Sequence, residues 1–401
     1  MTQCLDGERD FMTDHSSDEK FLHRALDVAR QGLGLASPGP YVGAVIVDPR
    51  GNVAGTGFYT YDGVKHAEVL ALEQAGHNAR GGTLYINLEP HCHHGRTPPC
   101  TDALIAAGIH RVVACMPDPN PKVSGRGFEK LRAAGIHVEV GLLEAEARRL
   151  NEAFARYIRH GIPLVTLKSA MTLNGKIAPP PASGLNREVG IPPGGWITGG
   201  TARAHVHEQR HESDAILVGI GTILADDPLL TDRSGRSRRR PLLRVILDSH
   251  LRLPIESRLV QSVMSRGTLS NDALVFCCHG EEKKKKELEA HGIRVEQLST
   301  DASDPYIDMR AVLRRLGQLE ITSLMIEGGA SVNGSALAAG IVDKIFLYYA
   351  PKILALDGSI PFASGAALRG TIHIPQIKHL QLHRFGEDFA VEGYLRDPYD
   401  D

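Results

Sequence analysis

The sequence lacks the features that mark membrane, secreted or nucleic-acid-binding proteins. It has no uninterrupted apolar run of the about 18 residues that a membrane span needs, and its polar start lacks the basic and apolar parts of a signal peptide. Six cysteines in 401 residues are too few for a disulfide scaffold and suit a reducing compartment. The formal net charge is only −2, so no basic excess attracts a polyanion. We therefore expect a cytoplasmic protein that binds neither membranes nor nucleic acids.

The chain also lacks internal repeats, low-complexity tracts and a Gly/Ser-rich linker. Strand-like and helix-like patterns alternate in both halves, which predicts an α/β fold throughout. Gly161-Ile162-Pro163 interrupts these patterns and indicates a boundary between two domains. The expected divisions are a disordered tail at 1–17, a first α/β domain at 18–160 and a second at 161–401.

The spacing of apolar residues predicts the elements around the chemically active residues. A helix is expected to open at His66, and a strand at 83–88 should end just before a loop rich in metal-ligand residues. A helix at 101–107 follows that loop. Further on, the pattern predicts a single helix from Leu142 to Tyr157 and a loop from Gly219 to Leu230.

The densest group of reactive side chains lies between Leu88 and Cys100, downstream of His66-Ala67-Glu68. Imidazole and thiolate are ligands that Zn²⁺ prefers, and catalytic zinc keeps three protein ligands and one open position. An H-x-E sequence followed by a Pro-Cys…Cys run is the signature of zinc nucleobase deaminases. In that signature a histidine and two cysteines hold the metal, while the glutamate carries protons. Zinc lowers the pKa of its bound water to about 7, which makes a nucleophile available at neutral pH.

One position departs from this signature. His91 follows Pro90, and the cysteine comes one residue later, at Cys92. The predicted ligands are therefore His66, Cys100 and either His91 or Cys92, with Glu68 as the proton carrier. The alternative is a closed, four-ligand structural zinc knot, in which Glu68 would be an ordinary surface residue.

The second half lacks G-x-G-x-x-G after a strand, the usual dinucleotide fingerprint. A strand at 323–326 instead runs into Glu327-Gly328-Gly329-Ala330-Ser331 and a helix reaching Ala339. Glycines at such a turn let a phosphate approach the backbone N–H groups at the start of a helix. An ordinary strand-to-helix turn without a ligand is the alternative interpretation.

Several motifs resemble one family of two-domain enzymes. They are Val42-Gly43-Ala44-Val45, His66-Ala67-Glu68-Val69, Leu88-Glu89-Pro90, His94-Gly95-Arg96-Thr97-Pro98-Pro99-Cys100, the run from Asp118 to Gly127, the run from Leu167 to Lys176, Trp196-Ile197-Thr198, the run from Ile223 to Thr231, and Glu327-Gly328-Gly329. The sequence is similar to the bifunctional enzymes of riboflavin biosynthesis, which join a diaminohydroxyphosphoribosylaminopyrimidine deaminase to a 5-amino-6-(5-phosphoribosylamino)uracil reductase. The resemblance implies an N-terminal cytidine-deaminase-like α/β/α domain and a C-terminal dihydrofolate-reductase-like α/β domain. It also implies Zn²⁺, NADPH, a small phosphoribosylaminopyrimidine substrate and a homo-oligomer.

The resemblance further implies residue roles. The NADPH contacts carried over by position are Ala170, Trp196, Thr222, Asp226, Ser249, Gly329, Ala330, Ser331, Val332, Asn333, Gly334 and Ser335. The substrate contacts are Arg210, Leu230, Arg233 and Glu327. The two arginines fit a ribose phosphate because guanidinium groups bind phosphate through paired hydrogen bonds.

The chain departs from the family pattern at a few sites. His91 stands nine positions before Cys100, where the family has its first cysteine ligand. Gly39 replaces an Asn expected to contact the pyrimidine, Asn174 replaces an Asp, and Gly194 stands in an enlarged loop where a Ser contacts substrate. Two other functions are therefore kept open. One is a zinc deaminase acting on tRNA or DNA, which the net charge disfavours, and the other is a working reductase with a degenerate, inactive deaminase-like domain.

Overall fold

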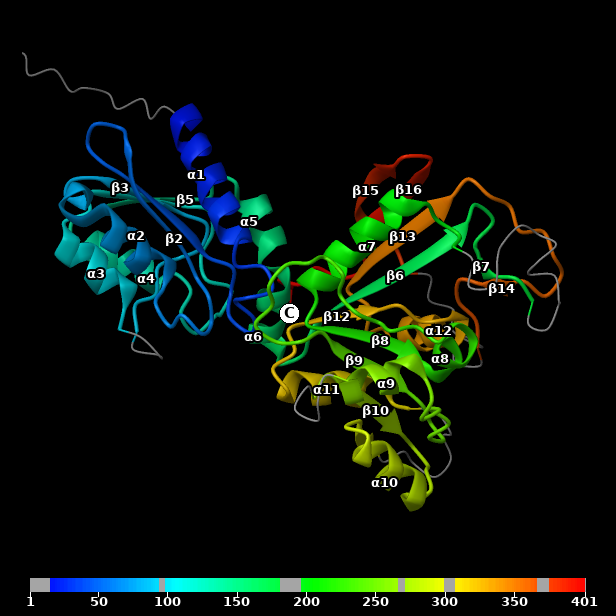
Figure 1. Ribbon diagram of the computed structural model, residues 1–401. Helices are drawn as coiled ribbons and strands as arrows, with labels where there is room; N and C mark the ends of the chain where they lie inside the picture. Colours follow the sequence, from blue (N-terminus) through cyan, green and yellow to red (C-terminus); the bar gives the residue numbers. More distant parts are fainter. Residues whose placement is uncertain are drawn as a thin grey trace, which may run out of the picture. The chain divides into compact units, whose positions relative to one another are not determined.

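The computed structural model describes residues 15–93, 98–180, 196–265, 271–298, 307–365 and 375–400. These residues form two compact units, shown by sequence colour in Figure 1. The first unit comprises the chain up to Gly32 together with Tyr41–Asn151, and the second comprises Leu33–Pro40 and the chain from Glu152 onward. Most of the predicted disordered tail, and Gly194, lie outside the described residues. Residues 15–17 already belong to the first helix.

The first unit is a five-stranded sheet with helices on both faces. The strands have the order β2-β1-β3-β4-β5; β2 and β3 pair antiparallel with β1, and β3, β4 and β5 are parallel. Its elements are α1 (His15–Arg30), β1 (Gly43–Val47), β2 (Val53–Phe58), α2 (Ala67–Ala75), the 3₁₀ helix η1 (Gly76–Ala79), β3 (Thr83–Ile86), α3 (Cys100–Ala107), β4 (Arg111–Ala114), α4 (Arg126–Ala133), β5 (His137–Val140) and α5 (Glu144–Leu150).

Side-chain alternation along β3 explains the two helical layers. Leu84 and Ile86 join a buried cluster that includes residues of α2, α3 and α4. Tyr85 points to the opposite face, where its hydroxyl donates to Asp18 Oδ1 of α1 at 2.7 Å. The predicted α/β/α arrangement of the first domain is confirmed.

The second unit is built on a nine-stranded sheet with the order β11-β10-β9-β8-β12-β6-β13-β16-β15. The seven strands from β11 to β13 are parallel, and β16 and β15 add an antiparallel ribbon at one edge. Its elements are α6 (Glu152–His160), β6 (Leu164–Thr172), β7 (Lys176–Ala178), α7 (Gly200–Glu212), β8 (Ala215–Gly219), α8 (Ile220–Asp226), β9 (Leu243–Leu247), α9 (Arg258–Ser265), β10 (Ala273–Cys277), α10 (Glu282–Ala290), β11 (Arg294–Gln297), α11 (Met309–Gln318), β12 (Ser323–Ile326), α12 (Ala330–Ala338), β13 (Lys344–Ala350), β14 (Ile360–Pro361), β15 (Lys378–Phe385) and β16 (Asp388–Tyr394).

Both faces of this sheet are covered. Leu217 and Val245 belong to one buried apolar cluster, whereas their neighbours Ile216 and Ile246 belong to a second cluster. Parallel strands that are apolar on both sides require helices on both faces. The predicted α/β class of the second domain is therefore confirmed. No helix among the described residues is long and apolar enough to cross a membrane.

Two sequence predictions of local structure are wrong. The single helix expected from Leu142 to Tyr157 is broken between α5 and α6 at Asn151. The Asn151 side chain is buried and bonds the backbone of Tyr41, accepting from its N–H at 2.8 Å and donating to its carbonyl at 3.0 Å. The loop expected at 219–230 contains α8, whose Ile220 and Ile223 are buried.

Helix α6 is anchored by buried charges of the second unit. Glu152 pairs with Lys344 Nζ at 2.6 Å, and Arg156 Nε lies 3.4 Å from Asp343 Oδ1. Segment 33–40 belongs to the same unit, where Ser37 donates to Asp214 Oδ2 at 2.6 Å. Removal of either piece would leave buried charged or polar groups without these partners.

Candidate active sites

Three reactive side chains converge in the first unit. His66 is the N-cap residue of α2, Glu68 lies in the first turn of that helix, and Cys100 is the first residue of α3. One ligand atom from each lies within 4.8 Å of the others, and His66 Nδ1 is 2.7 Å from Cys100 Sγ. Glu68 and Cys100 are both buried. The helix starts predicted at these positions therefore bring a histidine, a carboxylate and a thiol to one point.

The electrostatics of this group fit a bound cation. Burial raises the pKa of Glu68, although the nearby His66 acts against the shift. Burial and the neighbouring Glu68 raise the pKa of the Cys100 thiol. A divalent cation would favour the deprotonated form of the Cys100 thiol, because metal binding releases protons from its ligands. The closed structural knot is disfavoured, since Glu68 is buried beside the ligands and is not a surface residue.

His91 lies near this group but outside its compact set of three. Its ring centroid is 5.4 Å from that of His66, and its carbonyl accepts from Thr101 N–H at 3.3 Å. Burial, His93 and His66 lower the pKa of His91 to about 4, which keeps the imidazole neutral. His91 Nδ1 is buried and has no hydrogen-bond partner among the described residues. A buried nitrogen whose lone pair accepts no hydrogen bond is suited to bind a metal. Cys92, the alternative, is half-buried.

Glu89 has a structural role that sequence analysis did not assign. Its buried carboxylate accepts backbone N–H groups from Asp118 at 3.0 Å, Gly125 at 2.8 Å and Gly127 at 2.7 Å. Glu89 thereby joins the loop after β3 to the segment that leads into α4. Burial, and to a lesser degree the charge of Glu89, raise the pKa of Asp118 to about 6. The Leu-Glu-Pro motif was the available signal for this role, but the partners of Glu89 lie 29 to 38 residues away in the chain.

In the second unit, most residues of the predicted NADPH set gather at one edge of the sheet. Strands β9, β8, β12 and β6 are consecutive and parallel, so their carboxyl ends share that edge. The residues there are Ser249 after β9, Thr222 and Asp226 in α8, Gly329 to Ser335 at the start of α12, and Ala170 in β6. Ligands of open α/β sheets bind outside the carboxyl ends of such strands. Figure 1 shows α8 and α12 near one another at this edge.

The starts of α8 and α12 pack directly together. A Cβ atom added at Gly219 would lie 2.7 Å from Val332 Cγ2, and one added at Gly328 would lie 2.6 Å from the same side chain. Glycine is therefore required at both turns. At Gly329, in contrast, an added Cβ would meet no atom within 4 Å. Two helix N-termini beside an open space fit the phosphates of a dinucleotide.

The predicted substrate residues Arg210 and Glu327 bind each other. Arg210 donates through Nε and Nη2 to the two carboxylate oxygens of Glu327, at 2.7 and 3.0 Å. Lys168 Nζ, which sequence analysis did not single out, lies 3.3 Å from Glu327 Oε2. Burial by itself would raise the pKa of Glu327, but Lys168 and Arg210 outweigh it and lower the pKa to about 2. Lys168 is the one charged residue of β6, and this was the signal for it.

Comparisons with known proteins identify the family of each domain. Residues 15–116 match the cytidine and deoxycytidylate deaminase zinc-binding region, and residues 163–391 match the RibD C-terminal domain. The chain is 38% identical to riboflavin biosynthesis protein RibD of Aquifex aeolicus, over 93% of this chain and 97% of that protein. It is 37% identical to the Escherichia coli protein of the same name, over 93% of this chain and 98% of the relative. The chain belongs to the RibD family.

Solved structures of RibD proteins share this fold over nearly the whole chain. Acinetobacter baumannii RibD aligns with a TM-score of 0.78 and 33% identity, over 94% of this chain and 99% of that one. A Thermotoga maritima structure, described as a diaminohydroxyphosphoribosylaminopyrimidine deaminase/5-amino-6-(5-phosphoribosylamino)uracil reductase, aligns with a TM-score of 0.75 and 36% identity, over 95% and 99% of the two chains.

Membership of the RibD family confirms several predictions. The chain is a bifunctional enzyme of riboflavin biosynthesis, with a zinc-dependent deaminase domain and an NADPH-dependent reductase domain. It acts on a small-molecule substrate. The alternative of an inactive deaminase half is not favoured, because His66, Glu68 and Cys100 are retained together.

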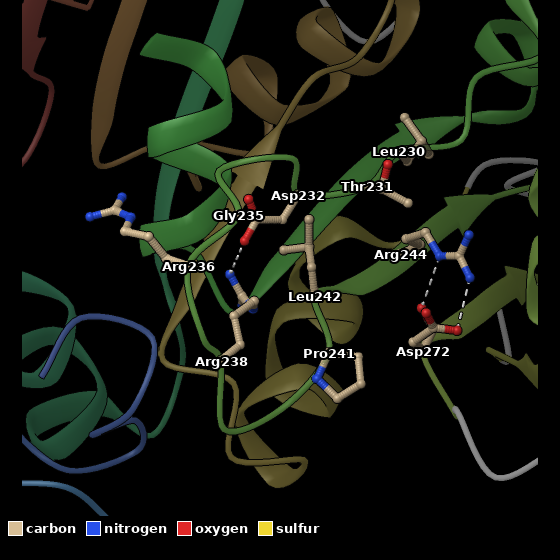
Figure 2. A pocket seen from close by; sticks show the side chains of 10 residues that line it. All are labelled: Leu230, Thr231, Asp232, Gly235, Arg236, Arg238, Pro241, Leu242, Arg244 and Asp272. Atoms are coloured by element: carbon tan, nitrogen blue, oxygen red, sulfur yellow. Dashed lines mark hydrogen bonds and ion pairs between the residues drawn. The ribbon is translucent and has the colours of Figure 1, made fainter. Parts of the chain in front are cut away.

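A pocket of about 320 Å³ in the reductase domain is lined by one of the four predicted substrate residues. Its lining includes Leu230 but not Arg210, Arg233 or Glu327. Figure 2 shows two internal ion pairs on its walls, Arg238 with Asp232 and Arg244 with Asp272, while Arg236 projects away from them. Most of the positive charge of the pocket is therefore neutralised within the protein, and the pocket does not form an arginine-rich phosphate site.

Trp196, from the predicted NADPH set, is 66% exposed, and the Arg203 guanidinium lies 4.8 Å from its ring centroid.

Proposed function

We propose that the first domain removes an amino group from diaminohydroxyphosphoribosylaminopyrimidine and that the second reduces the ribosyl side chain of the product to ribityl. The observation that carries this proposal is the buried group of His66, Glu68 and Cys100, at the start of two helices in the deaminase domain. The arrangement of helix starts at the edge of the reductase sheet supports the second step.

For the deaminase site, we propose that His66, Cys100 and His91 are zinc ligands and that Glu68 is not. Zinc, when bound, supplies a Lewis acid that activates water. Glu68 accepts a proton from that water, then delivers protons to the ring nitrogen and to the departing ammonia. Its burial suits this role, because a carboxylate with a raised pKa takes up a proton readily and still returns it.

His91 is preferred to Cys92 as the third ligand for two reasons. His91 stands nine positions before Cys100, the spacing that the family uses between its two cysteine ligands. Its Nδ1 atom is buried without a partner among the described residues. Cys92 is the alternative if the loop shifts by one residue. Sulfur donates more charge than nitrogen, so the choice changes both the electrophilicity of the metal and how tightly it is held.

X-ray absorption tests this ligand set. Zinc–sulfur distances are about 2.3 Å and zinc–nitrogen distances about 2.0–2.1 Å, so the two ligand types are resolved. We expect one sulfur in the wild-type protein, unchanged in Cys92→Ser and absent in Cys100→Ala if any metal remains. Two sulfurs in the wild type, with one lost in Cys92→Ser, would reverse the assignment to Cys92.

For the reductase site, we propose that NADPH contacts Ala170, Trp196, Thr222, Asp226, Ser249 and residues 329–335. NADPH, when bound, supplies the hydride. The N-termini of α8 and α12 hold its phosphates through backbone N–H groups. Substrate would contact Leu230, Arg233, Arg210 and Glu327. Arg233 is exposed, with a 3.5 Å contact from its Nε to Thr231 Oγ1, and its guanidinium suits the ribose phosphate. Glu327 stays ionised between two cations and can accept hydrogen bonds from the pyrimidine.

We also propose that the enzyme is cytoplasmic and forms a homo-oligomer. Strand β15 ends the nine-stranded sheet, and its Leu380 and Leu382 side chains are 55% and 70% exposed. An edge strand with exposed apolar side chains favours association with a second copy. Light scattering should show more than one chain per particle, with dissociation in Leu382→Lys; a monomeric wild type would refute this part.

A further inference from the structure

His93 lies directly against the proposed ligand His91. The two Nε2 atoms are 2.9 Å apart, and the ring centroids are 3.7 Å apart with an angle of 47° between the planes. His93 is exposed, whereas His91 is half-buried. One ring must donate to the other, because a hydrogen bond between two neutral imidazoles needs one N–H and one lone pair.

A metal bound at Nδ1 of His91 would set the direction of this hydrogen bond. A neutral imidazole carries one proton, on either Nδ1 or Nε2. A proton on Nδ1 would leave a buried donor that has no partner among the described residues and that cannot bind a metal. A proton on Nε2 gives His91 an N–H to donate to His93 and leaves the buried Nδ1 with its lone pair. Only the second tautomer lets a bound metal satisfy the buried Nδ1, so a metal at that atom selects it.

This choice matters because a histidine occupies a position where the family has cysteine. A thiolate offers one ligating atom and has no tautomers. An imidazole offers two nitrogens, and only the one without a proton can bind a metal. A histidine ligand at this position therefore needs a partner that holds the proton on the outer nitrogen. Metal-binding histidines usually have such a partner for their second nitrogen.

We propose that His93 is a positioning residue for the zinc site: its Nε2 accepts the hydrogen bond from His91 Nε2–H and holds His91 in the tautomer and orientation that present Nδ1 to the metal. This inference rests on the proposed function, because it takes His91 as a ligand. His93 itself contacts neither metal nor substrate in this arrangement. Partners of this kind typically change metal affinity by about 10–100-fold.

The test is zinc affinity, measured by competition with a chelator on the full-length chain. His93→Ala should weaken zinc binding about 10–100-fold. His93→Gln should recover much of the loss, because its amide oxygen can accept from His91, whereas His93→Lys should not, because an ammonium group only donates. His77→Ala, at an exposed histidine of η1, is the matched control and should leave affinity unchanged.

A second readout separates positioning from folding. With Co²⁺ in place of zinc, the visible spectrum reports ligand geometry, and His93→Ala should change it while His93→Gln restores it. Unchanged affinity and spectrum in His93→Ala, with one sulfur per zinc in the wild type, would overturn the role of His93 and leave the proposed ligand set standing. Two sulfurs per zinc in the wild type would instead overturn both the ligand role of His91 and the positioning role of His93. If His93→Ala loses zinc affinity and His93→Gln does not recover it, the hydrogen-bonding role of His93 is also refuted.

Discussion

Replacing Glu327 by Gln tests the buried charge cluster of the reductase domain. Glu327 is 12% exposed and is held between Lys168 and Arg210, which are 12% and 13% exposed. Glutamine keeps the shape of the side chain but removes its negative charge. It is therefore a close mimic of protonated Glu327, and the two neighbouring cations lose their counter-charge.

The size of the effect follows from the lowered pKa. The pKa of Glu327 falls from 4.5 to about 2, a change of about 2.5 at about 1.36 kcal/mol per pKa unit, which gives ~3 kcal/mol. Because the pKa is depressed in the folded state, this stabilisation is fully present above pH 4.5 and is lost as the pH falls toward 2. Glu327→Gln should therefore cost ~3 kcal/mol at neutral pH and roughly half of that near pH 3.

Hydrogen exchange measured by mass spectrometry gives the assay. Peptides covering β6 and β12 should exchange about 100-fold faster in Glu327→Gln at neutral pH, and the difference should shrink in acid. Glu289→Gln, at an exposed position of α10, is the matched control. A cost below about 1 kcal/mol at neutral pH, or the same cost at both pH values, would refute the claim that Lys168 and Arg210 stabilise an ionised Glu327.

Three further predictions concern other parts of the chain. Gly329 has φ −76° and ψ 179°, and a Cβ atom added there would meet no atom within 4 Å. Gly329→Ala should therefore leave the melting temperature unchanged but raise the KM for NADPH about tenfold. An unchanged KM would exclude a cofactor phosphate close to Gly329. Glu89→Gln turns a buried acceptor partly into a donor facing backbone N–H groups, and should destabilise the deaminase domain by about 1–3 kcal/mol in thermal unfolding, whereas a silent change would refute its bracing role. A fragment of residues 152–401 should be more stable to urea than one of 162–401, because only the former keeps helix α6 with its ion pairs; equal stability would refute that anchoring.

The parts that the sequence predicts well depend on local patterns. Strands β3 and β12 lie where the apolar pattern predicts them, and the helix starts at His66 and Cys100 follow from their neighbours in the chain. Two predicted zinc ligands and the proposed proton-carrying glutamate could therefore be located without a structure. The gathering of the NADPH set also follows, since parallel strands order their carboxyl ends along one edge.

The parts that the sequence does not predict depend on distant partners. The helix break at Asn151 results from hydrogen bonds to Tyr41, 110 positions earlier. Helix α8 contains a glycine and spans only seven residues, so packing of Ile220 and Ile223 decides its formation over local propensity. The pairing of Lys168 with Glu327 joins residues 159 positions apart. No local pattern carries such information.

The most direct test of the account is ammonia release by the purified enzyme from the diaminopyrimidine substrate, measured with and without NADPH. Without NADPH, the wild type should release one ammonia per substrate and accumulate the deaminated pyrimidine, and added NADPH should then be oxidised in equal amount. Glu68→Gln should retain zinc, lose at least about 100-fold in ammonia release, and still oxidise NADPH with the deaminated compound. A Glu68→Gln enzyme that releases ammonia at the wild-type rate would contradict the proton-transfer role. A zinc-loaded wild type that releases none would contradict the central claim.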